Sequence, residues 1–297
     1  MTEKAPLFFA GIEGGGTKFV CAIGTSGGKI LAETRIPTTT PEETLSRTVS
    51  FIQEQMQSLG SLAAIGVASF GPLDLQPASA KYGHILLTPK PGWTDADIVG
   101  PLRAAFDVPI GFDTDVNGAA LGEWRWGAAQ GLDTFIYLTI GTGIGGGGLV
   151  NCELVHGLLH PEMGHISLPR VAGDVFESIC PFHQDCFEGL ASGPAIEKRW
   201  GEKAKNLSVG HPAWELEASY IASALRSFIC TLSPQRIVLG GGVMQQTYLL
   251  PLIRQKTLKE LNGYVQSPQI LERIDEYIVP VALEGKAGIL GAFVLAE

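Results

Sequence analysis

The sequence predicts an α/β protein of two duplicated domains with a cleft between them, and three observations support this prediction. A strand–glycine–strand pattern spans residues 7–23 and occurs again over residues 134–153. Two diverged copies of one hairpin indicate an internal duplication. Short apolar runs typical of buried strands alternate with helical segments along the rest of the chain. The 297 residues, 45% of them hydrophobic, suffice for two domains, or one large one, with a substantial core.

The composition excludes several classes of protein. The net charge of −9 and the pI near 5.2 argue against binding to a nucleic acid backbone, because no basic stretch offsets the repulsion. Residues 1–6 are polar, and the apolar run at residues 7–12 is too short for a signal core or a membrane span. Five cysteines, two of them in one cluster, fit a reducing compartment better than a disulfide framework. We therefore expect a soluble, cytoplasmic protein that binds neither nucleic acid nor membrane.

The first glycine turn, at residues 13–18, joins two apolar strands and predicts a β-hairpin. It is not a Walker P-loop, which needs a second glycine before Lys-Ser/Thr and a helix after it. The backbone N–H groups of Gly14, Gly15 and Gly16 could contact phosphate oxygens, because glycine permits close approach and positive φ values. A glycine-rich turn without a ligand is the alternative, and this stretch alone does not decide between the two.

A helix and a buried strand follow the first hairpin. Thr40 is the expected N-cap, Pro41 is the expected first helical residue, and Glu43 completes a capping box. Gly60 ends this helix, and residues 63–69 form the strand.

Polar residues stand at the end of the next strand, which covers residues 109–112. Asp113, Thr114 and Asp115 lie between this strand and a helix predicted over residues 118–126. Open α/β sheets bind their ligands at such places, outside the carboxyl ends of the strands. The plainer interpretation is that Asp113 or Asp115 caps the helix, and we expect one of them to do so.

The second glycine turn covers residues 141–148, between strands at residues 134–140 and 149–153. Two glycine hairpins that face each other across a cleft could hold a polyphosphate from both sides. The pair is therefore more specific evidence for phosphate binding than either hairpin alone. A third glycine cluster, Gly240-Gly241-Gly242, ends a strand at residues 235–239.

Cysteine and histidine spacing predicts a metal site. Cys180, His183 and Cys186 follow one another at intervals of three residues, and His165 lies upstream. Zinc prefers four thiolate or imidazole ligands in a tetrahedron, and one loop can supply several of them. Four protein ligands without an evident open position indicate a structural site. A surface loop with two ordinary cysteines and a Cys180–Cys186 disulfide are the alternatives, and zinc is the preferred interpretation.

The C-terminal segment predicts a helix of small residues, beginning near residue 284, that packs closely on a neighbour or returns to the first domain. We place the first domain at residues 1–117 and the second at residues 118–283. The helix at about residues 284–297 is expected to return to the first domain.

Together these motifs resemble the ROK family of sugar kinases over nearly the whole chain. The matching segments are the first phosphate hairpin at Glu13–Lys18, the second at Ile140–Gly146, the sugar-binding segment Glu162–His165, the zinc segment Cys180–Glu188 and the adenosine segment Leu239–Val243. The resemblance is strongest to the bacterial zinc-containing fructokinases, through Asp113–Gly118 and the loop at residues 88–93. It implies an actin/hexokinase-like (ribonuclease H-like) fold with the active site in the cleft between the domains.

The resemblance also implies roles for individual residues. The implied ATP and phosphate contacts are Gly14, Gly15, Gly16, Thr17, Lys18, Thr142, Gly143, Gly145, Gly241 and Gly242. The implied sugar contacts are Thr114, Asp115, Glu162, His165 and Glu188, with Asp115 as the general base. The implied structural zinc ligands are His165, Cys180, His183 and Cys186. Magnesium with ATP and a homodimer are further implications.

Two positions depart from the family pattern. The family usually has Asp where this chain has Glu13, which changes how far the carboxylate reaches toward a magnesium-bound water. The family cluster usually holds three cysteines, whereas Phe182 occupies the middle position here. As in fructokinase-like members, His183 takes over with a shift of one residue.

The predicted activity is the ATP-dependent phosphorylation of D-fructose to fructose 6-phosphate. A kinase of glucose, mannose or an N-acyl-hexosamine is the alternative within the family, because a few hydroxyl contacts decide specificity. A non-catalytic sugar-sensing regulator is the alternative from another class. Such regulators carry an N-terminal helix-turn-helix, for which a hairpin beginning at residue 13 leaves no room. An idle sugar-binding protein would have no use for phosphate hairpins.

Overall fold

Two five-stranded sheets, each containing one of the glycine hairpins, form the framework of the chain. The computed structural model describes residues 7–297. Residues 1–6 lie outside the described residues. Their polarity was one reason to expect no signal peptide. None of the helices in the described part of the chain is long and apolar enough to cross a lipid bilayer.

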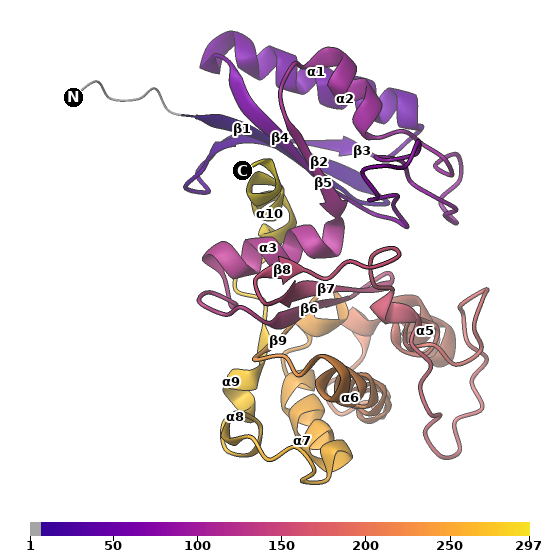
Figure 1. The fold of residues 1–297 in the computed structure, drawn as a ribbon. Helices are drawn as coiled ribbons and strands as arrows, with labels where there is room; N and C mark the ends of the chain where they lie inside the picture. The colour runs from indigo at the N-terminus through magenta and orange to yellow at the C-terminus, as the bar shows by residue number, and fades with distance from the viewer. Residues whose placement is uncertain (1–6) are drawn as a thin grey trace. The chain divides into compact units, whose positions relative to one another are not determined.

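The first sheet has the strand order β3-β2-β1-β4-β5 (Figure 1). Its strands are β1 (Phe8–Gly14), β2 (Lys18–Thr25), β3 (Ile30–Pro37), β4 (Leu62–Ser69) and β5 (Ile110–Thr114). The helices of this unit are α1 (Pro41–Leu59), α2 (Val99–Ala105), α3 (Asp115–Trp126) and α10 (Ala287–Ala296). Helices α1 and α2 cover one face of the sheet, and α10 packs against the other face together with α3 (Figure 1).

The second sheet has the strand order β10-β9-β6-β7-β8. Its strands are β6 (Phe135–Ile140), β7 (Ile144–Val150), β8 (Glu153–Leu154), β9 (Ile237–Gly240) and β10 (Ile278–Pro280). The accompanying helices are α4 (Phe187–Ala191), α5 (Gly193–Trp200), α6 (Ala213–Leu232), α7 (Leu249–Leu261), α8 (Pro268–Leu271) and α9 (Ile274–Tyr277). Short 3-10 turns are η1 (Met163–His165), η2 (Ala204–Asn206) and η3 (Val243–Gln245).

The two sheets share one topology, so the predicted duplication is confirmed. In the first sheet β1 pairs antiparallel with β2 and β2 with β3, whereas β1–β4 and β4–β5 are parallel. In the second sheet β6–β7 and β7–β8 are antiparallel, whereas β6–β9 and β9–β10 are parallel. In each copy the glycine turn therefore joins the central strand to its antiparallel neighbour.

The chain folds into two compact units whose limits differ from the predicted domains. The first unit contains the chain up to Gln130, the segment Val155–His160 and the segment Leu283–Glu297. The boundary expected after residue 117 falls inside α3, and the structure keeps this helix whole because it packs along α10. No sequence pattern indicates that Val155–His160 belongs to the first unit. The extent of each unit as an independently folding domain stays a prediction.

Helix α1 begins and ends largely where the capping residues predicted. The hydroxyl of Thr40 accepts from the Glu43 N–H at 3.3 Å, with Pro41 at the first helical position and Gly60 at the end. The Glu43 carboxylate, however, accepts from the Thr39 hydroxyl at 2.7 Å. The Thr40 cap therefore forms as expected, whereas the Glu43 carboxylate binds the side chain of Thr39.

A row of glycines lets α10 approach the first sheet. Gly11, Gly66 and Gly111 are register partners on the neighbouring strands β1, β4 and β5. A Cβ at Gly66 would lie 1.7 Å from the carbonyl oxygen of Ala292, and one at Gly111 would lie 1.8 Å from that of Leu295. Because real Cβ atoms do not approach so closely, only glycine permits this distance between the helix backbone and the sheet.

Glycines also line the contact between α10 and α3. A Cβ at Gly291 would lie 1.6 Å from the carbonyl oxygen of Gly118, and one at Gly122 would lie 2.2 Å from that of Ala287. The backbones of the two helices therefore touch, and α10 is held from two sides. The position of α3, including its first residue Asp115, depends on this contact.

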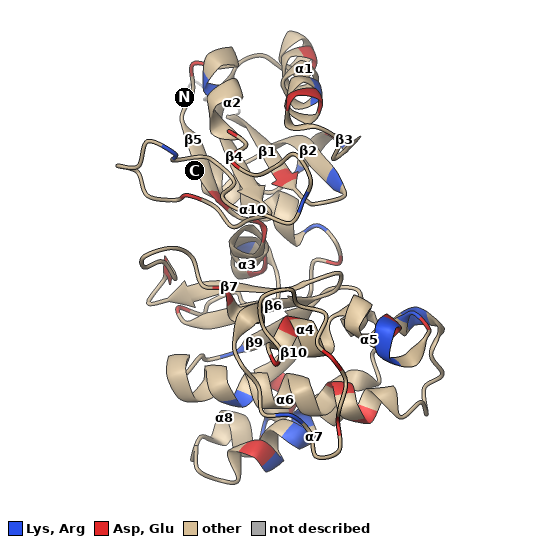
Figure 2. Cartoon of the chain, turned by 90° about the vertical axis from the view of Figure 1, so that its right-hand side faces the viewer, with Lys and Arg blue, Asp and Glu red and all other residues tan. Residues whose placement is uncertain are grey.

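Charged side chains of both signs occur in each unit (Figure 2). Glu42, Glu43 and Arg47 lie on α1, and Glu197, Lys198 and Arg199 follow one another on α5. On these helices the basic residues are accompanied by acidic ones.

Replacing Gly66 with alanine should destabilise the protein by about 3 kcal/mol, because the added methyl group overlaps the α10 backbone. Gly16→Ala is the control, since no atom of the described residues lies within 4 Å of its Cβ position and its φ is not positive. Chemical denaturation would measure both variants. Equal free energies of unfolding would contradict the proposed role of the glycine row.

Candidate active site and metal centre

The first glycine hairpin presents an open tip at the end of β1 and β2. The Gly15 N–H donates to the Lys18 carbonyl at 3.0 Å, and the Thr38 hydroxyl donates to the Gly15 carbonyl at 2.7 Å. Gly16, Thr17 and Lys18 are exposed. The positive φ values expected of these glycines do not occur. What glycine supplies at the tip is an uncovered backbone that a ligand can approach.

The second glycine hairpin is fixed by hydrogen bonds from two later helices. The Gly193 N–H, at the start of α5, donates to the Gly141 carbonyl at 2.7 Å. The Ile144 N–H donates to Oε2 of Glu188, which lies on α4, at 2.8 Å. A Cβ at Gly143 would lie 2.7 Å from the same oxygen, so a larger residue there would displace the carboxylate. Thr142 is exposed at the tip, and Gly145 pairs with Thr139 in the ladder.

The third glycine cluster lies beside the second hairpin, at the carboxyl ends of the parallel strands β9 and β6. Gly241 has φ +92°, and a Cβ there would lie 2.4 Å from the Ile140 carbonyl oxygen. No atom of the described residues lies within 4 Å of a Cβ at Gly242. The structure therefore brings Thr142, Gly241 and Gly242 to one edge of the second sheet, where α/β proteins bind ligands.

Asp115 is the first residue of α3, and the residue that caps this helix is Thr114. The Thr114 hydroxyl accepts from the Asn117 N–H at 3.1 Å, and Oδ1 of Asp115 accepts from the Val116 N–H at 2.9 Å. The expectation that Asp113 or Asp115 caps the helix was wrong. Thr114 has the extended backbone of an N-cap, whereas Asp115 already has helical geometry.

Asp113 is a buried carboxylate whose structural role differs from the predicted helix cap. Its side chain is 3% exposed, and Oδ1 accepts from the Thr114 N–H and the Asn117 side-chain amide, each at 2.7 Å. Its Oδ2 lies 2.9 Å from Nε2 of His156. His156 was missed because it lies far along the chain, after β8, with no motif around it. The hydrogen bond to Asp113 raises the pKa of His156 above 6.5.

Glu13 takes part in the packing of α10. Its carboxylate accepts a hydrogen bond from the backbone N–H of Ile289, in the first turn of the helix, where the helix dipole favours negative charge. A Cβ at Gly288 would lie 2.5 Å from the Glu13 carboxyl carbon. Burial raises the pKa of Glu13, against the opposing effect of Lys18. The side chain of Glu13, which is longer than the Asp usual in the family, therefore reaches the N-terminus of α10.

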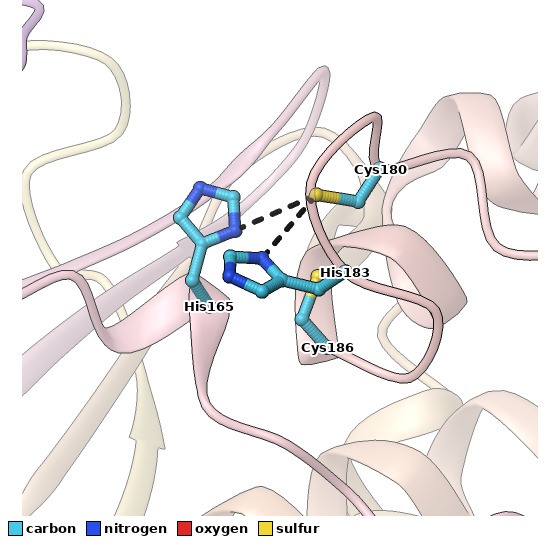
Figure 3. A group of neighbouring side chains, drawn as sticks. All are labelled: His165, Cys180, His183 and Cys186. Carbon is cyan, nitrogen blue, oxygen red and sulfur yellow. Dashed lines mark hydrogen bonds between the residues drawn. The ribbon is translucent and has the colours of Figure 1, made fainter.

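The four predicted zinc ligands come together in the second unit (Figure 3). One ligand atom from each of His165, Cys180, His183 and Cys186 lies within 4.8 Å of every other. Sγ of Cys180 is 3.6 Å from Nδ1 of His183 and 3.9 Å from Nδ1 of His165. All five cysteines in the described chain are free, so the alternative of a Cys180–Cys186 disulfide is wrong.

This donor set fits a zinc ion. Zn–S bonds of about 2.3 Å and Zn–N bonds of about 2.0 Å place tetrahedral ligand atoms roughly 3.3–3.8 Å apart. The two distances from Cys180 are near this range. Burial raises the pKa of Cys186 to about 12, so its thiol needs a cation to become a thiolate near neutral pH. Sγ of Cys186 also accepts from the Gly189 N–H at 3.3 Å, which orients it.

The predicted sugar contacts of the second unit lie next to the ligand loop. Glu162 precedes η1, and its carbonyl accepts from the His165 N–H at 2.9 Å. Partial removal from solvent and the charge of Glu188 raise the pKa of Glu162. Glu188 follows the ligand Cys186 by two residues on α4. The metal loop, both carboxylates and the second hairpin thus form one connected group.

The Asp113–His156 pair should make stability depend on pH. Because the folded-state pKa of His156 is raised, its contribution is complete below the ordinary value of 6.5 and declines as pH rises through the raised value. His156 is 40% exposed, so solvent limits the effect to about 1 kcal/mol. The stability difference between the natural protein and His156→Gln should shrink as pH rises above the ordinary histidine pKa of 6.5. A difference that stays constant would contradict the pairing.

Comparisons with known proteins agree with this geometry. The model of the ROK family matches residues 9–297. The fructokinase of Zymomonas mobilis subsp. mobilis is 46% identical over 96% of this chain and 95% of that protein, and the fructokinase of Pediococcus pentosaceus is 43% identical over 98% of each. The solved ROK hexokinase of Thermus thermophilus superposes with a TM-score of 0.81 at 27% identity, over 98% of each chain. The predicted actin/hexokinase-like fold is confirmed, and the chain belongs to the ROK family.

Proposed function

We propose that this protein is a fructokinase, which transfers the γ-phosphoryl group of ATP to the 6-hydroxyl of D-fructose. The observation that carries the proposal is the similarity to two fructokinases, at 46% and 43% identity, over at least 96% of this chain. The reaction consumes ATP and fructose and yields ADP and fructose 6-phosphate. The two glycine hairpins and the carboxylate at the start of α3 supply the groups that such a transfer needs.

Asp115 is the proposed general base. A phosphoryl transfer asks for positioning, charge neutralisation and acceptance of one proton from the attacking hydroxyl. Asp115 stands at the carboxyl end of β5, and the dipole of α3 favours its negative charge. The carboxylate would take the proton of the 6-hydroxyl as that oxygen attacks the γ-phosphorus.

Backbone groups would hold the phosphates and the nucleotide. The proposed contacts in the first unit are Gly14, Gly15, Gly16, Thr17 and Lys18, and those in the second unit are Thr142, Gly143, Gly145, Gly241 and Gly242. Lys18 is exposed at the end of the first hairpin, where its ammonium group can meet phosphate oxygens. Magnesium bound with ATP would neutralise charge on the phosphates.

The sugar would be held by Thr114 from the first unit and by Glu162, His165 and Glu188 from the second. In Figure 3 one ring nitrogen of His165 faces Cys180 and the other points away from it. One nitrogen can therefore serve a metal while the other serves a hydroxyl group. Glu188 has one oxygen on the Ile144 N–H, so a sugar contact through this residue is linked to the second hairpin.

We propose that zinc binds His165, Cys180, His183 and Cys186 and is structural. The support is the donor set of two sulfurs and two nitrogens gathered from η1 and one loop. When bound, zinc would fix the loop that leads into Glu188. By resemblance to the family we also propose that the protein works as a homodimer in the cytoplasm.

The natural protein should release ADP from ATP and magnesium with its highest kcat/KM for fructose, among fructose, glucose, mannose, N-acetylglucosamine and N-acetylmannosamine. Asp115→Asn should lower kcat by about 10²–10⁴-fold, because the amide cannot accept the proton. A coupled spectrophotometric assay measures both. Preference for another sugar would contradict the assignment of fructose as substrate, but not the assignment of Asp115 as the base. Absence of turnover in a folded, metal-loaded protein would favour the regulator or the idle binder.

Removing zinc should destabilise the second unit. We expect one zinc per chain by elemental analysis, and a lower melting temperature after chelation or in Cys180→Ser, because the metal crosslinks η1 to the ligand loop. Cys230→Ser is the control, since this exposed cysteine lies outside the cluster. Equal zinc contents in the two variants would contradict the proposed ligand set.

A further inference from the structure

His156 lies on a short segment that the chain sends back to the first unit. Residues 155–160 belong to this unit, although the residues on both sides of them belong to the second. Side-chain contacts hold the segment. His156 pairs with Asp113, the Leu73 N–H donates to Nε2 of His160 at 3.0 Å, and Nε2 of Gln76 donates to the Gly157 carbonyl at 3.1 Å. The imidazole of His156 is therefore delivered by an anchored segment.

One histidine of this segment accepts a hydrogen bond through Nε2, and the other donates one. Nε2 of His160 accepts a hydrogen bond, whereas Nε2 of His156 faces a carboxylate oxygen and must donate. The Asn117 side-chain amide lies 3.4 Å from Nε2 of His156, but both nitrogens are donors in this arrangement. The amide instead donates to Oδ1 of Asp113. The carboxylate of Asp113 is thus shared between α3 and the returning segment.

Asp113 controls the first turn of α3. One of its oxygens binds the Thr114 N–H and the Asn117 amide, and Thr114 in turn caps the helix through the Asn117 N–H. The next residue after Thr114 is Asp115. These bonds fix the backbone on both sides of Asp115, and they require the carboxyl group of Asp113 to keep its present orientation.

Losing the donor of His156 would disturb this arrangement. Among the described residues, His156 is the only one found to donate a hydrogen bond to Oδ2 of Asp113, and this donor would be lost. The Asp113 side chain is only 3% exposed, so water would not readily replace the donor. A buried carboxyl group that loses a hydrogen-bond donor rotates toward another donor. This rotation weakens the bonds from Thr114 and Asn117, and displaces the first turn of α3.

We propose that His156 is a positioning residue, which acts through Asp113 to hold the first turn of α3, and with it the carboxylate of Asp115, in the orientation that proton abstraction needs. The proposal rests on the proposed function, since it assigns Asp115 as the base. Small displacements of a catalytic group lower the rate of the chemical step more than the binding of substrates.

The test compares His156→Leu, which removes the donor, with His156→Gln, whose amide restores it. His156→Leu should lower kcat by about 10–100-fold, with the KM values for ATP and fructose changed by less than about threefold. His156→Gln should recover kcat to within about threefold of the natural protein. His84→Leu is the matched control, because His84 also faces a carboxylate, Asp97, at 3.9 Å, and neither residue belongs to α3. It should change kcat by less than about twofold.

A double-mutant cycle separates positioning from a purely structural role. In an Asp113→Asn background, His156→Leu should cost less than about twofold in kcat, because the proposed route through Asp113 is already cut. Equal losses for the Leu and Gln variants, an effect confined to KM, or an undiminished loss in the Asp113→Asn background would overturn the proposal. If His156→Leu does not fold, His156→Ala removes the same donor with a smaller side chain, and the same comparisons apply to it. Activity of the natural protein on fructose, measured first, tests the proposed function separately.

Discussion

The contact of α10 with the sheet and with α3 is the constraint on which the first unit depends. Gly11, Gly66 and Gly111 form a row across three strands, and the α10 backbone lies directly on it. Gly291 of α10 meets the backbone of α3 at Gly118. Because these contacts involve backbone atoms, they leave little freedom for either helix to shift. The place of Asp115 is thereby set by residues close to the C-terminus of the chain.

Carboxylates bind the backbone at the N-terminal ends of the two helices, α10 and α3. Glu13 caps the first turn of α10, and Asp113 ties the first turn of α3 to the returning segment through His156. In the second unit Glu188 has a comparable position, since it links the metal-ligand loop to the second glycine hairpin. In all three cases a carboxylate binds backbone N–H groups near a residue proposed to contact substrate. Such hydrogen bonds orient the backbone of a site around the groups that contact substrate.

The sequence predicted features that depend on short local patterns, but it did not predict features that depend on contacts between residues far apart in the chain. The hairpins, α1 and the metal cluster come from short patterns, and the ligand spacing already limits where Cys180, His183 and Cys186 can lie. The cap of α3 was misassigned, because three adjacent residues were suitable and a distant partner, His156, engaged Asp113. The glycine row was missed, since glycines in separate strands show nothing of the helix that will cover them.

The most direct test of the account is the place of the sugar's 6-hydroxyl relative to Asp115. A crystal structure with fructose, magnesium and a non-hydrolysable ATP analogue would measure it. We expect an oxygen of Asp115 within about 2.6–3.2 Å of the 6-hydroxyl, with that hydroxyl directed at the γ-phosphorus. Another carboxylate at that distance, such as Glu162, or a 6-hydroxyl directed away from Asp115, would contradict the assignment of the base.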